Sequence, residues 1–569
     1  HLLRLATMTQ PASAQRALAG TVAGSPVSLS LRDGQLVVTH AHTHAVRLSV
    51  PVELVLDAAV VPDNDGGVLS AQLLAPPKRP LHSSLACIAS RKHYPGARVL
   101  TAEQWQQREG ADRLELVQLD ACLGTDAQAE APHFVEQLLA CAYPHTEPYR
   151  RVLVICNPMG GQGRGRRVLR EKVEPVLRAA RCHIQVQETQ KKAHAYTLAY
   201  EAHLDNVDVI VCIGGDGTAH EIINALVARP DADRALRVPL ALVPCGSGNG
   251  AFVSAFGPKV GFNSELACLG AVKGRSHSRE LCALTQPLEL HTSMNHPVPY
   301  QTVNTASGQC ALVYTFLSQS IGLMADVDLG TESLRFLGDL RFTLGYVYGV
   351  LRNRPCDIDV DVVLGENGSL HTRAMHDRAV RARASSPPAP AQAAEPTALR
   401  YGTVRDALPQ DRAVLKLPAT MEQLEACEAQ HRSDWIRLNV HVSSLYGGKL
   451  PFVARTLMAF PYVLPCDGAL DVMVQRTDAS CKDKLDAMIA SEHGRHVHAD
   501  TIDYLKVEAL RVSPQSKTPN NHSRYLSVDG EMLPFGPFQV EVCQRQWHLV
   551  SLEDDEWRSP ALAPRPPTA

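Results

Sequence analysis

The sequence lacks any apolar run approaching the roughly 20 residues that a helix needs to cross a bilayer, and its beginning lacks the pattern of a signal peptide. It also lacks a strong charge of either sign, because 56 lysines and arginines are balanced by 59 aspartates and glutamates. The formal net charge of -3 gives no reason to expect nucleic acid as the main partner. No protein partner can be assigned from these properties.

C-x-x-C pairs are also missing, although the chain contains 15 cysteines. The number is odd, and some cysteines, such as Cys156 and Cys212, lie inside predicted buried strands. This pattern favours reduced thiols in a cytosolic protein over disulfides or zinc sites. At 569 residues the length suggests roughly three or four domains, which is ample for sizeable cores.

What the sequence does contain is three glycine-rich loops, each directly after a short β-branched and apolar run. Residues 151–167 read RVLVICNPMGGQGRGRR, residues 209–218 read VIVCIGGDGT, and residues 238–250 read VPLALVPCGSGNG. Each run predicts a buried strand, and helical spacing follows the first two loops. Glycine lets a backbone approach a phosphate closely, and the N–H groups at a following helix can face an anion. Loops after successive parallel strands meet at one sheet edge, where open α/β sheets bind ligands.

The motifs NPMGGQGRG, GGDGT and PCGSGNG, in this order, resemble the signature of the diacylglycerol kinase and sphingosine kinase superfamily of lipid kinases. Residues 321–343 are similar to the segment that marks the sphingosine kinase branch, and VDGE at 528–531 matches its last motif. The resemblance covers about Tyr149 to Leu552 with interruptions. One departure is Met159, since related kinases often carry a basic residue there, so a direct charge contact is lost.

The resemblance implies an α/β nucleotide-binding domain with a parallel sheet over residues 148–286, similar to diacylglycerol kinases and NAD kinases. An antiparallel, β-rich lipid-binding domain is expected over 287–556, with the lipid pocket between the two. The Pro- and Ala-rich composition that begins near Arg381 cannot bury a core, so we predict a disordered insertion at about 376–434. Residues 557–569 are predicted to be a disordered tail.

Residues 1–147 are predicted to form an additional β-rich module. Alternating apolar residues flank the turn signal Asp33-Gly34, and residues 133–142 are expected to form a closing helix. A regulatory or membrane-surface role for this module is a hypothesis. His40, His42 and His44 would share one strand face, for which an exposed polar surface is favoured over a metal site.

Asp216 is the residue that the resemblance makes catalytic, as the base that accepts the proton of the attacking lipid hydroxyl. ATP is the implied phosphoryl donor, with Mg²⁺ bridging its phosphates, and no residue is assigned as a metal ligand. Glu221 is expected to help hold the nucleotide. Asp328 aligns with the aspartate that recognises the ammonium group of a sphingoid base. If the chain is extended there, Asp326 and Asp328 point the same way.

The other implied nucleotide contacts are Asn157, Pro158, Met159, Gly160, Gly161, Gly163, Thr189, Lys191, Lys192, Gly214, Gly215, Gly217, Thr218, Gly246, Ser247, Gly248, Arg335, Arg341, Asp529, Gly530 and Glu531. Gly214, Gly215 and Gly217 are placed at the lipid as well, together with Asp216 and Asp328. Solvated helix surface is the competing interpretation for the arginines. Candidate liners of an apolar channel are Phe336, Leu337, Leu340, Phe342, Leu344 and Val347, which core packing explains equally well.

The function that these expectations describe is ATP-dependent phosphorylation of the primary hydroxyl of sphingoid long-chain bases, such as sphingosine, dihydrosphingosine and phytosphingosine. Such an enzyme would be cytoplasmic and would associate peripherally with intracellular membranes, where its lipid substrate resides. A diacylglycerol or ceramide kinase, an NAD kinase or phosphofructokinase-like enzyme, and an inactive lipid-binding or scaffold protein are the alternatives. Asp328 argues against the first, and the joint presence of Asp216, Glu221 and Glu531 argues against the last.

Overall fold

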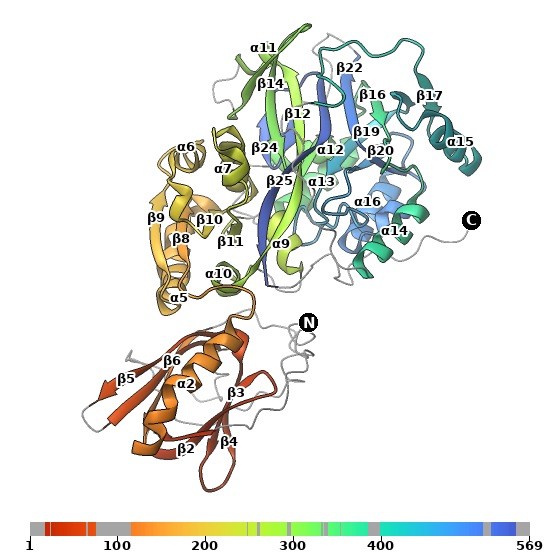
Figure 1. Cartoon of the computed structure of the whole chain (residues 1–569). Helices are drawn as coiled ribbons and strands as arrows, with labels where there is room; N and C mark the ends of the chain where they lie inside the picture. Colours follow the sequence, from red (N-terminus) through yellow and green to blue (C-terminus); the bar gives the residue numbers. More distant parts are fainter. Residues whose placement is uncertain are drawn as a thin grey trace.

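The computed structural model describes residues 17–22, 24–63, 66–75, 115–246, 248–258, 262–292, 298–331, 334, 340–352, 354–384, 399–515 and 525–552 (Figure 1). The predicted tail at 557–569 lies outside these residues. Within them, no helix has the length and apolar character needed to cross a membrane. The cysteines of the described part are free thiols.

The N-terminal part forms a seven-stranded antiparallel sheet in the order β4-β3-β2-β1-β7-β6-β5, followed by helix α2 (Thr125–Ala142). Its strands are β1 (Ala17–Val22), β2 (Ser25–Arg32), β3 (Gln35–His40), β4 (Val46–Pro51), β5 (Val55–Asp63), β6 (Gly66–Ala75) and β7 (Glu115–Leu123). The helix begins well before the predicted residue 133.

β3 ends at His40, whose Nδ1 accepts hydrogen bonds from the backbone of His42 and Thr43. The three histidines therefore lie in and around a turn, and the prediction that they share a strand face is wrong.

Lys273 forms hydrogen bonds that join the N-terminal module to the rest of the chain. It is the last residue of α10 (Ser264–Lys273), and its ammonium group donates to the backbone oxygens of Val52, Val55 and Ala142. Burial lowers the pKa of Lys273 to about 7. The module thus lies against the end of α10, at one end of the molecule (Figure 1).

The largest sheet has 12 strands and contains the three predicted strand and loop units. Its main path is β17 (Ala413–Lys416), β18 (Ile436–Asn439), β16 (Ile358–Val363), β22 (Ala509–Pro514), β25 (Phe538–Ser551), β11 (Leu240–Pro244), β10 (Val209–Gly214), β8 (Arg151–Cys156) and β9 (His183–Glu188). The pairings among β8, β9, β10 and β11 are parallel, as predicted for the nucleotide-binding part. Apolar residues fill β8, β10 and β11 because both faces of the sheet are covered there, whereas the edge strand β9 is polar and more exposed.

β25 joins the two halves of this sheet. It pairs with β11 in parallel and with β12 (Arg275–Pro287) and β22 in antiparallel fashion, and β12 also pairs with β14 (Gly308–Thr315). The boundary predicted at 286/287 therefore does not coincide with a break in the sheet, because hydrogen bonding is continuous from the nucleotide-binding strands into the antiparallel part.

A second, six-stranded antiparallel sheet lies beside the first. Its order is β21 (Ile502–Val507), β20 (Leu470–Arg476), β19 (Val442–Gly448), β15 (Ser318–Gly322), β23 (Leu526–Val528) and β24 (Glu531–Leu533). Residues 436–448 carry one alternating pattern at their start but form two strands, β18 and β19, which belong to different sheets. The alternating pattern continues across the break, so it gave no signal of the change of sheet.

The predicted disordered insertion at 376–434 is wrong for most of its length. The chain there forms α14 (Thr372–Ala384), β17 and α15 (Met421–His431). The Thr420 side chain caps α15, and the Arg400 guanidinium lies 2.7 Å from the Glu508 carboxylate. Only residues 385–398, which carry the Pro- and Ala-rich sequence, lie outside the described part. The average composition of residues 376–434 did not indicate the helix cap and the ion pair that stabilise the parts on either side of residues 385–398.

Candidate active site

The three glycine loops contact one another at the carboxyl ends of β8, β10 and β11. The Asn157 side chain donates to the Thr218 hydroxyl over 3.3 Å, which ties the first loop to the second. Gly161 has φ +58, and a Cβ there would lie 1.3 Å from the backbone oxygen of Cys245 in the third loop. The close backbone approach that the glycines predicted is therefore present, and no larger residue fits at Gly161.

Asp216 lies at the start of α7 (Asp216–Ala228), where the second loop meets the helix. Its carboxylate oxygens accept hydrogen bonds from the backbone N–H of Gly250, at 2.8 Å, and of Ala251, at 3.1 Å. These are the first residues of α9 (Gly250–Phe256). Burial raises the pKa of Asp216 to about 7, although the two hydrogen bonds oppose the shift. A carboxylate that titrates near neutral pH is suited to accept a proton from a substrate.

Glu221 shapes the loop that carries the predicted lysines. Its carboxylate accepts from the backbone N–H of Ala193, at 3.2 Å, and of Ala195, at 3.0 Å. The Lys192 ammonium in this loop lies 3.8 Å from the Glu531 carboxylate. Burial and the nearby Glu531 raise the pKa of Glu221. The structure thus gives Glu221 a positioning role in addition to a place on the cavity wall.

Asp529 is held differently from what the motif suggested. Its buried carboxylate accepts from the Thr315 hydroxyl, from the backbone N–H of Phe316, Leu317 and Ser318, and from Nδ1 of His220 at 2.8 Å. Burial lowers the pKa of His220, but the ion pair with Asp529 outweighs it and the net shift is upward. We therefore revise the expectation that this carboxylate contacts the nucleotide. It anchors the turn, which leaves the backbone of Asp529 and Gly530 to line the cavity.

A cavity of about 1300 Å³ extends from the glycine loops into an apolar arm. Apolar residues that line it include Met324, Val327, Phe342, Tyr346, Met473 and Ile502. One continuous space therefore offers phosphate-binding loops and an environment for an aliphatic chain.

Asp328 lies on the wall of this cavity, on α12 (Leu323–Gly330), and accepts a 2.5 Å hydrogen bond from the Ser527 hydroxyl. Asp326 lines a separate cavity of about 260 Å³. Residues two apart in a helix point in different directions, so the expectation that Asp326 and Asp328 point the same way is wrong. Tyr446, on β19, also lines the large cavity, and burial together with the Asp328 charge raises its pKa. No sequence motif marks this isolated tyrosine.

Most predicted site residues line the one cavity. They are Asn157, Pro158, Met159, Gly160, Gly161, Thr189, Lys191, Lys192, Gly215, Asp216, Gly217, Thr218, Glu221, Gly246, Gly248, Asp328, Arg341, Asp529, Gly530 and Glu531. Gly163 and Gly214 are not on its wall, and a Cβ at Gly214 would lie 2.6 Å from the Thr218 hydroxyl. Ser247 and Arg335 lie outside the described residues.

The predicted liners of the apolar channel also divide into residues that line the cavity, residues that do not, and residues outside the described part. Phe342 faces the cavity, whereas the side chains of Leu344 and Val347 are 54% and 38% exposed, so for these two the prediction is wrong. They occupy the outer face of the helix α13 (Leu340–Arg352). The side chains of Phe336, Leu337 and Leu340 lie outside the described part.

Two polar residues of α7 that the sequence reasoning passed over connect the loops to the antiparallel strands. Asn224 exchanges hydrogen bonds with the backbone of Tyr314 on β14, at 2.8 and 2.9 Å, and the buried His220 lies one turn earlier. The available signal was a pair of polar residues, four apart and therefore on one face of the helix.

The described residues contain no group of three or more histidines, cysteines, aspartates or glutamates placed to hold a metal ion. The carboxylate of Asp216 accepts hydrogen bonds from two backbone N–H groups, and that of Asp529 accepts hydrogen bonds from a hydroxyl and from backbone N–H groups. The side chains therefore do not form a cage for Mg²⁺, which in phosphoryl-transfer sites binds largely through substrate phosphates.

Residues 151–284 match the family described as the diacylglycerol kinase catalytic domain. The chain is 28% identical over 446 residues to "Sphingoid long chain base kinase 5" of Saccharomyces cerevisiae, an alignment that covers 73% of this chain and 61% of the yeast protein. It is 27% identical over 423 residues to "Sphingoid long chain base kinase 4" of Schizosaccharomyces pombe, covering 74% and 79%. Among solved structures, a putative diacylglycerol kinase from Bacillus anthracis aligns with a TM-score of 0.43 and 15% identity, over 72% of this chain and 97% of that one.

Proposed function

We propose that this protein, whose residues 151–284 match the diacylglycerol kinase catalytic domain, is a lipid kinase that phosphorylates sphingoid long-chain bases. It transfers the γ-phosphoryl group of ATP to the primary hydroxyl of sphingosine, dihydrosphingosine or phytosphingosine and releases the 1-phosphate. The observation that carries the proposal is the cavity that joins the glycine loops to an apolar arm, with Asp216 and Asp328 both on its wall.

The glycine loops bind the phosphates of ATP. Their backbone N–H groups and the N-terminus of α7 provide donors where negative charge collects, and Lys191 and Lys192 add positive charge on the neighbouring loop. Mg²⁺ bound with the nucleotide neutralises part of the phosphate charge. The contact from Asn157 to Thr218 keeps the first two loops together.

Asp216 acts as the base. As the lipid hydroxyl oxygen forms its bond to the γ-phosphorus, the bond to the β-phosphate oxygen breaks, ADP leaves, and the hydroxyl proton passes to the Asp216 carboxylate. The hydrogen bonds from Gly250 and Ala251 hold that carboxylate in a fixed orientation. This positioning avoids the reorganisation that a free carboxylate would need.

Asp328 selects the lipid by charge. A sphingoid base carries an ammonium group beside its primary hydroxyl, and a carboxylate on the cavity wall is its natural partner. Ser527 orients the Asp328 carboxylate by a hydrogen bond to one of its oxygens. Diacylglycerol and ceramide lack the positive charge, which is why we rank a diacylglycerol or ceramide kinase second.

The outer face of α13 supports a peripheral position on a membrane. Leu344, Tyr348 and Leu351 recur at i, i+4 and i+7 and are 54%, 57% and 72% exposed. The opposite face of the same helix carries Tyr346, which lines the cavity. Ile489, on the adjacent α16 (Cys481–Ala490), is 74% exposed. An exposed apolar face beside a lipid cavity suits the surface of a cytoplasmic protein that takes its substrate from an intracellular membrane.

Vesicle sedimentation tests this surface. We expect the double substitution Leu344→Glu with Leu351→Glu to abolish binding to phospholipid vesicles. Val414→Glu is the matched control, because Val414 is 65% exposed on the distant β17. Equal binding of both variants would remove α13 from the proposal.

The function itself is tested by transfer of label from γ-labelled ATP with Mg²⁺ to sphingosine, dihydrosphingosine, phytosphingosine, diacylglycerol, ceramide and NAD. We expect label in the free sphingoid bases alone. Label in diacylglycerol or ceramide would support the second candidate, and label in NAD would support an NAD kinase. Absence of any lipid product would favour a non-catalytic lipid-binding protein.

A further inference from the structure

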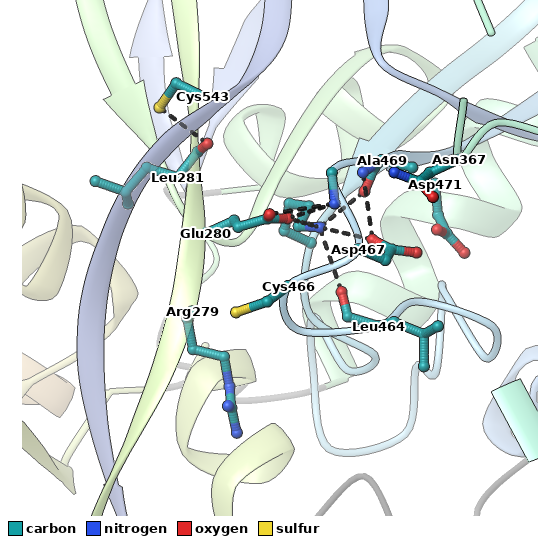
Figure 2. Close-up of polar contacts among 12 residues, drawn as sticks. Arg279, Glu280, Leu281, Asn367, Leu464, Cys466, Asp467, Ala469, Asp471 and Cys543 are labelled. Carbon is teal, nitrogen blue, oxygen red and sulfur yellow. Dashed lines mark hydrogen bonds and ion pairs between the residues drawn. The ribbon is translucent and has the colours of Figure 1, made fainter. Parts of the chain in front are cut away.

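The connection between β19 and β20, residues 449–469, is longer than ordinary loops between adjacent strands, and such loops are commonly functional. We call it the cavity loop. Both of its ends are held at one point by the buried Lys449, whose partners Glu280, Leu464, Asp467 and Ala469 are labelled in Figure 2. The Lys449 ammonium lies 2.9 Å from the Glu280 carboxylate and 3.1 Å from that of Asp467. It also donates to the backbone oxygens of Leu464 and Ala469.

The first half of the cavity loop is seated on α9. Ser254 donates from its hydroxyl to the backbone oxygen of Phe452 over 3.1 Å and accepts from the N–H of Phe452 over 3.0 Å. A Cβ on Gly250 would lie 2.7 Å from Cα of Val453. Because the N–H of Gly250 binds Asp216, this part of the loop lies next to the proposed base.

Arg455 is at the tip of this loop, between the paired residues Ala454 and Leu457, and it lines the cavity. Its side chain is exposed and forms no hydrogen bond or ion pair with any residue in the described part of the chain. Two other cavity cations lie beside carboxylates, since Arg166 pairs with Glu188 and the Lys192 ammonium lies 3.8 Å from Glu531. A planar guanidinium with open donors matches the geometry of a phosphate.

We infer that Arg455 is a phosphate-binding residue, which the cavity loop holds next to the group that is transferred. It contacts the γ-phosphate of ATP and then the phosphate of the lipid product. This inference rests on the proposed function. It also explains how a phosphate can bind in a cavity whose wall carries carboxylates. Asp216, Asp328 and Glu531 line this cavity and would repel a phosphate that lacked a cation beside it.

The first test uses nucleotide binding and needs no lipid. We would measure the affinities of wild type, Arg455→Met and Arg455→Lys for a non-hydrolysable ATP analogue and for ADP, with Mg²⁺. Arg455→Met should weaken the ATP analogue about 10-fold to 100-fold and ADP by much less, because a charge-assisted bond to the γ-phosphate is lost. Arg455→Lys should recover part of the difference. Arg495→Met is the matched control, since Arg495 is exposed and does not line the cavity.

The second test uses the lipid product. Arg455→Met should weaken binding of sphingosine 1-phosphate by a similar factor while leaving the affinity for sphingosine within about twofold. An equal loss for both lipids, or equal losses for the ATP analogue and ADP, would overturn the inference. If wild type phosphorylates no lipid but Arg455→Met still loses the ATP analogue selectively, the proposed substrate fails and the assignment of Arg455 to the γ-phosphate stands.

Discussion

Lys449 and Glu280 form a buried ion pair of 2.9 Å that joins the two sheets. Glu280 lies on β12 of the 12-stranded sheet, at an irregularity in its pairing with β25, and Lys449 directly follows β19 of the six-stranded sheet. Burial opposes the charge on Lys449, but Glu280 and Asp467 outweigh it and hold its pKa above the usual range. The Lys449 ammonium at this junction is buried, whereas the Glu280 side chain keeps 11% of its surface exposed.

Removal of the Lys449 charge should destabilise the protein strongly. Lys449→Met removes the ammonium partner of Glu280 and leaves Asp467 with Lys506 alone, so we expect the free energy of unfolding in urea to fall by about 3–5 kcal/mol. Lys482→Met is the control, because Lys482 is 85% exposed and lies 3.7 Å from Asp486. It should change the free energy by at most about 0.5 kcal/mol. Equal effects of the two substitutions would contradict the role given to the junction.

Asp216→Asn should abolish most of the phosphoryl transfer without unfolding the protein. The amide oxygen still accepts from the start of α9 but cannot take a proton, so turnover should fall about 10²-fold to 10⁴-fold. Labelled phosphate transfer measures the loss, and a thermal melt checks the fold. Turnover close to wild type would refute the assignment of Asp216 as the base.

The rate should depend on pH through the same residue. The pKa of Asp216 is raised to about 7, so the carboxylate is ionised above this pH and protonated below it. We expect kcat/KM to decrease as pH falls through about 7, because the protonated form cannot act as a base. A profile of kcat/KM between pH 5.5 and 8.5 would reveal this acid limb. A flat profile in that range would show that Asp216 does not control the rate.

Asp328 and Asp326 offer a matched pair on one helix. Asp328→Asn should lower kcat/KM for sphingosine about 10-fold to 100-fold, since a charge-assisted contact with the ammonium group is lost. Asp326→Asn should have little effect, because Asp326 lines the smaller cavity. Assays of both variants with the same lipid separate a contact with the substrate from a general effect on α12.

The sequence predicted the glycine loops well because their signals are local. A β-branched run followed by glycines defines strand, loop and helix within some 20 residues, and the parallel pairing of β8, β10 and β11 brings the loops together. Asp216 could be located for the same reason. Its partners Gly250 and Ala251 are less evident, because they depend on where α9 begins relative to the second loop.

Residues whose roles depend on distant partners were not predictable in this way. Asp529 lies in a recognisable motif, but its burial against β14 and β15 is decided by segments more than 200 residues away. Arg455 carries no local motif, and its position follows from the Lys449 junction and the Ser254 contact. Sequence pattern identifies such residues only after the topology is known.

The placement of β25 also governs how the protein can be made. This strand, residues 538–551, pairs with β12 along one side and with β22 and β11 along the other (Figure 1). During synthesis on the ribosome, the nucleotide-binding strands emerge well before β25, and the edge of β11 stays unpaired until residue 551 has left the exit tunnel. Unpaired strand edges invite association with other chains, so the nucleotide-binding strands are exposed to such association until β25 has been made.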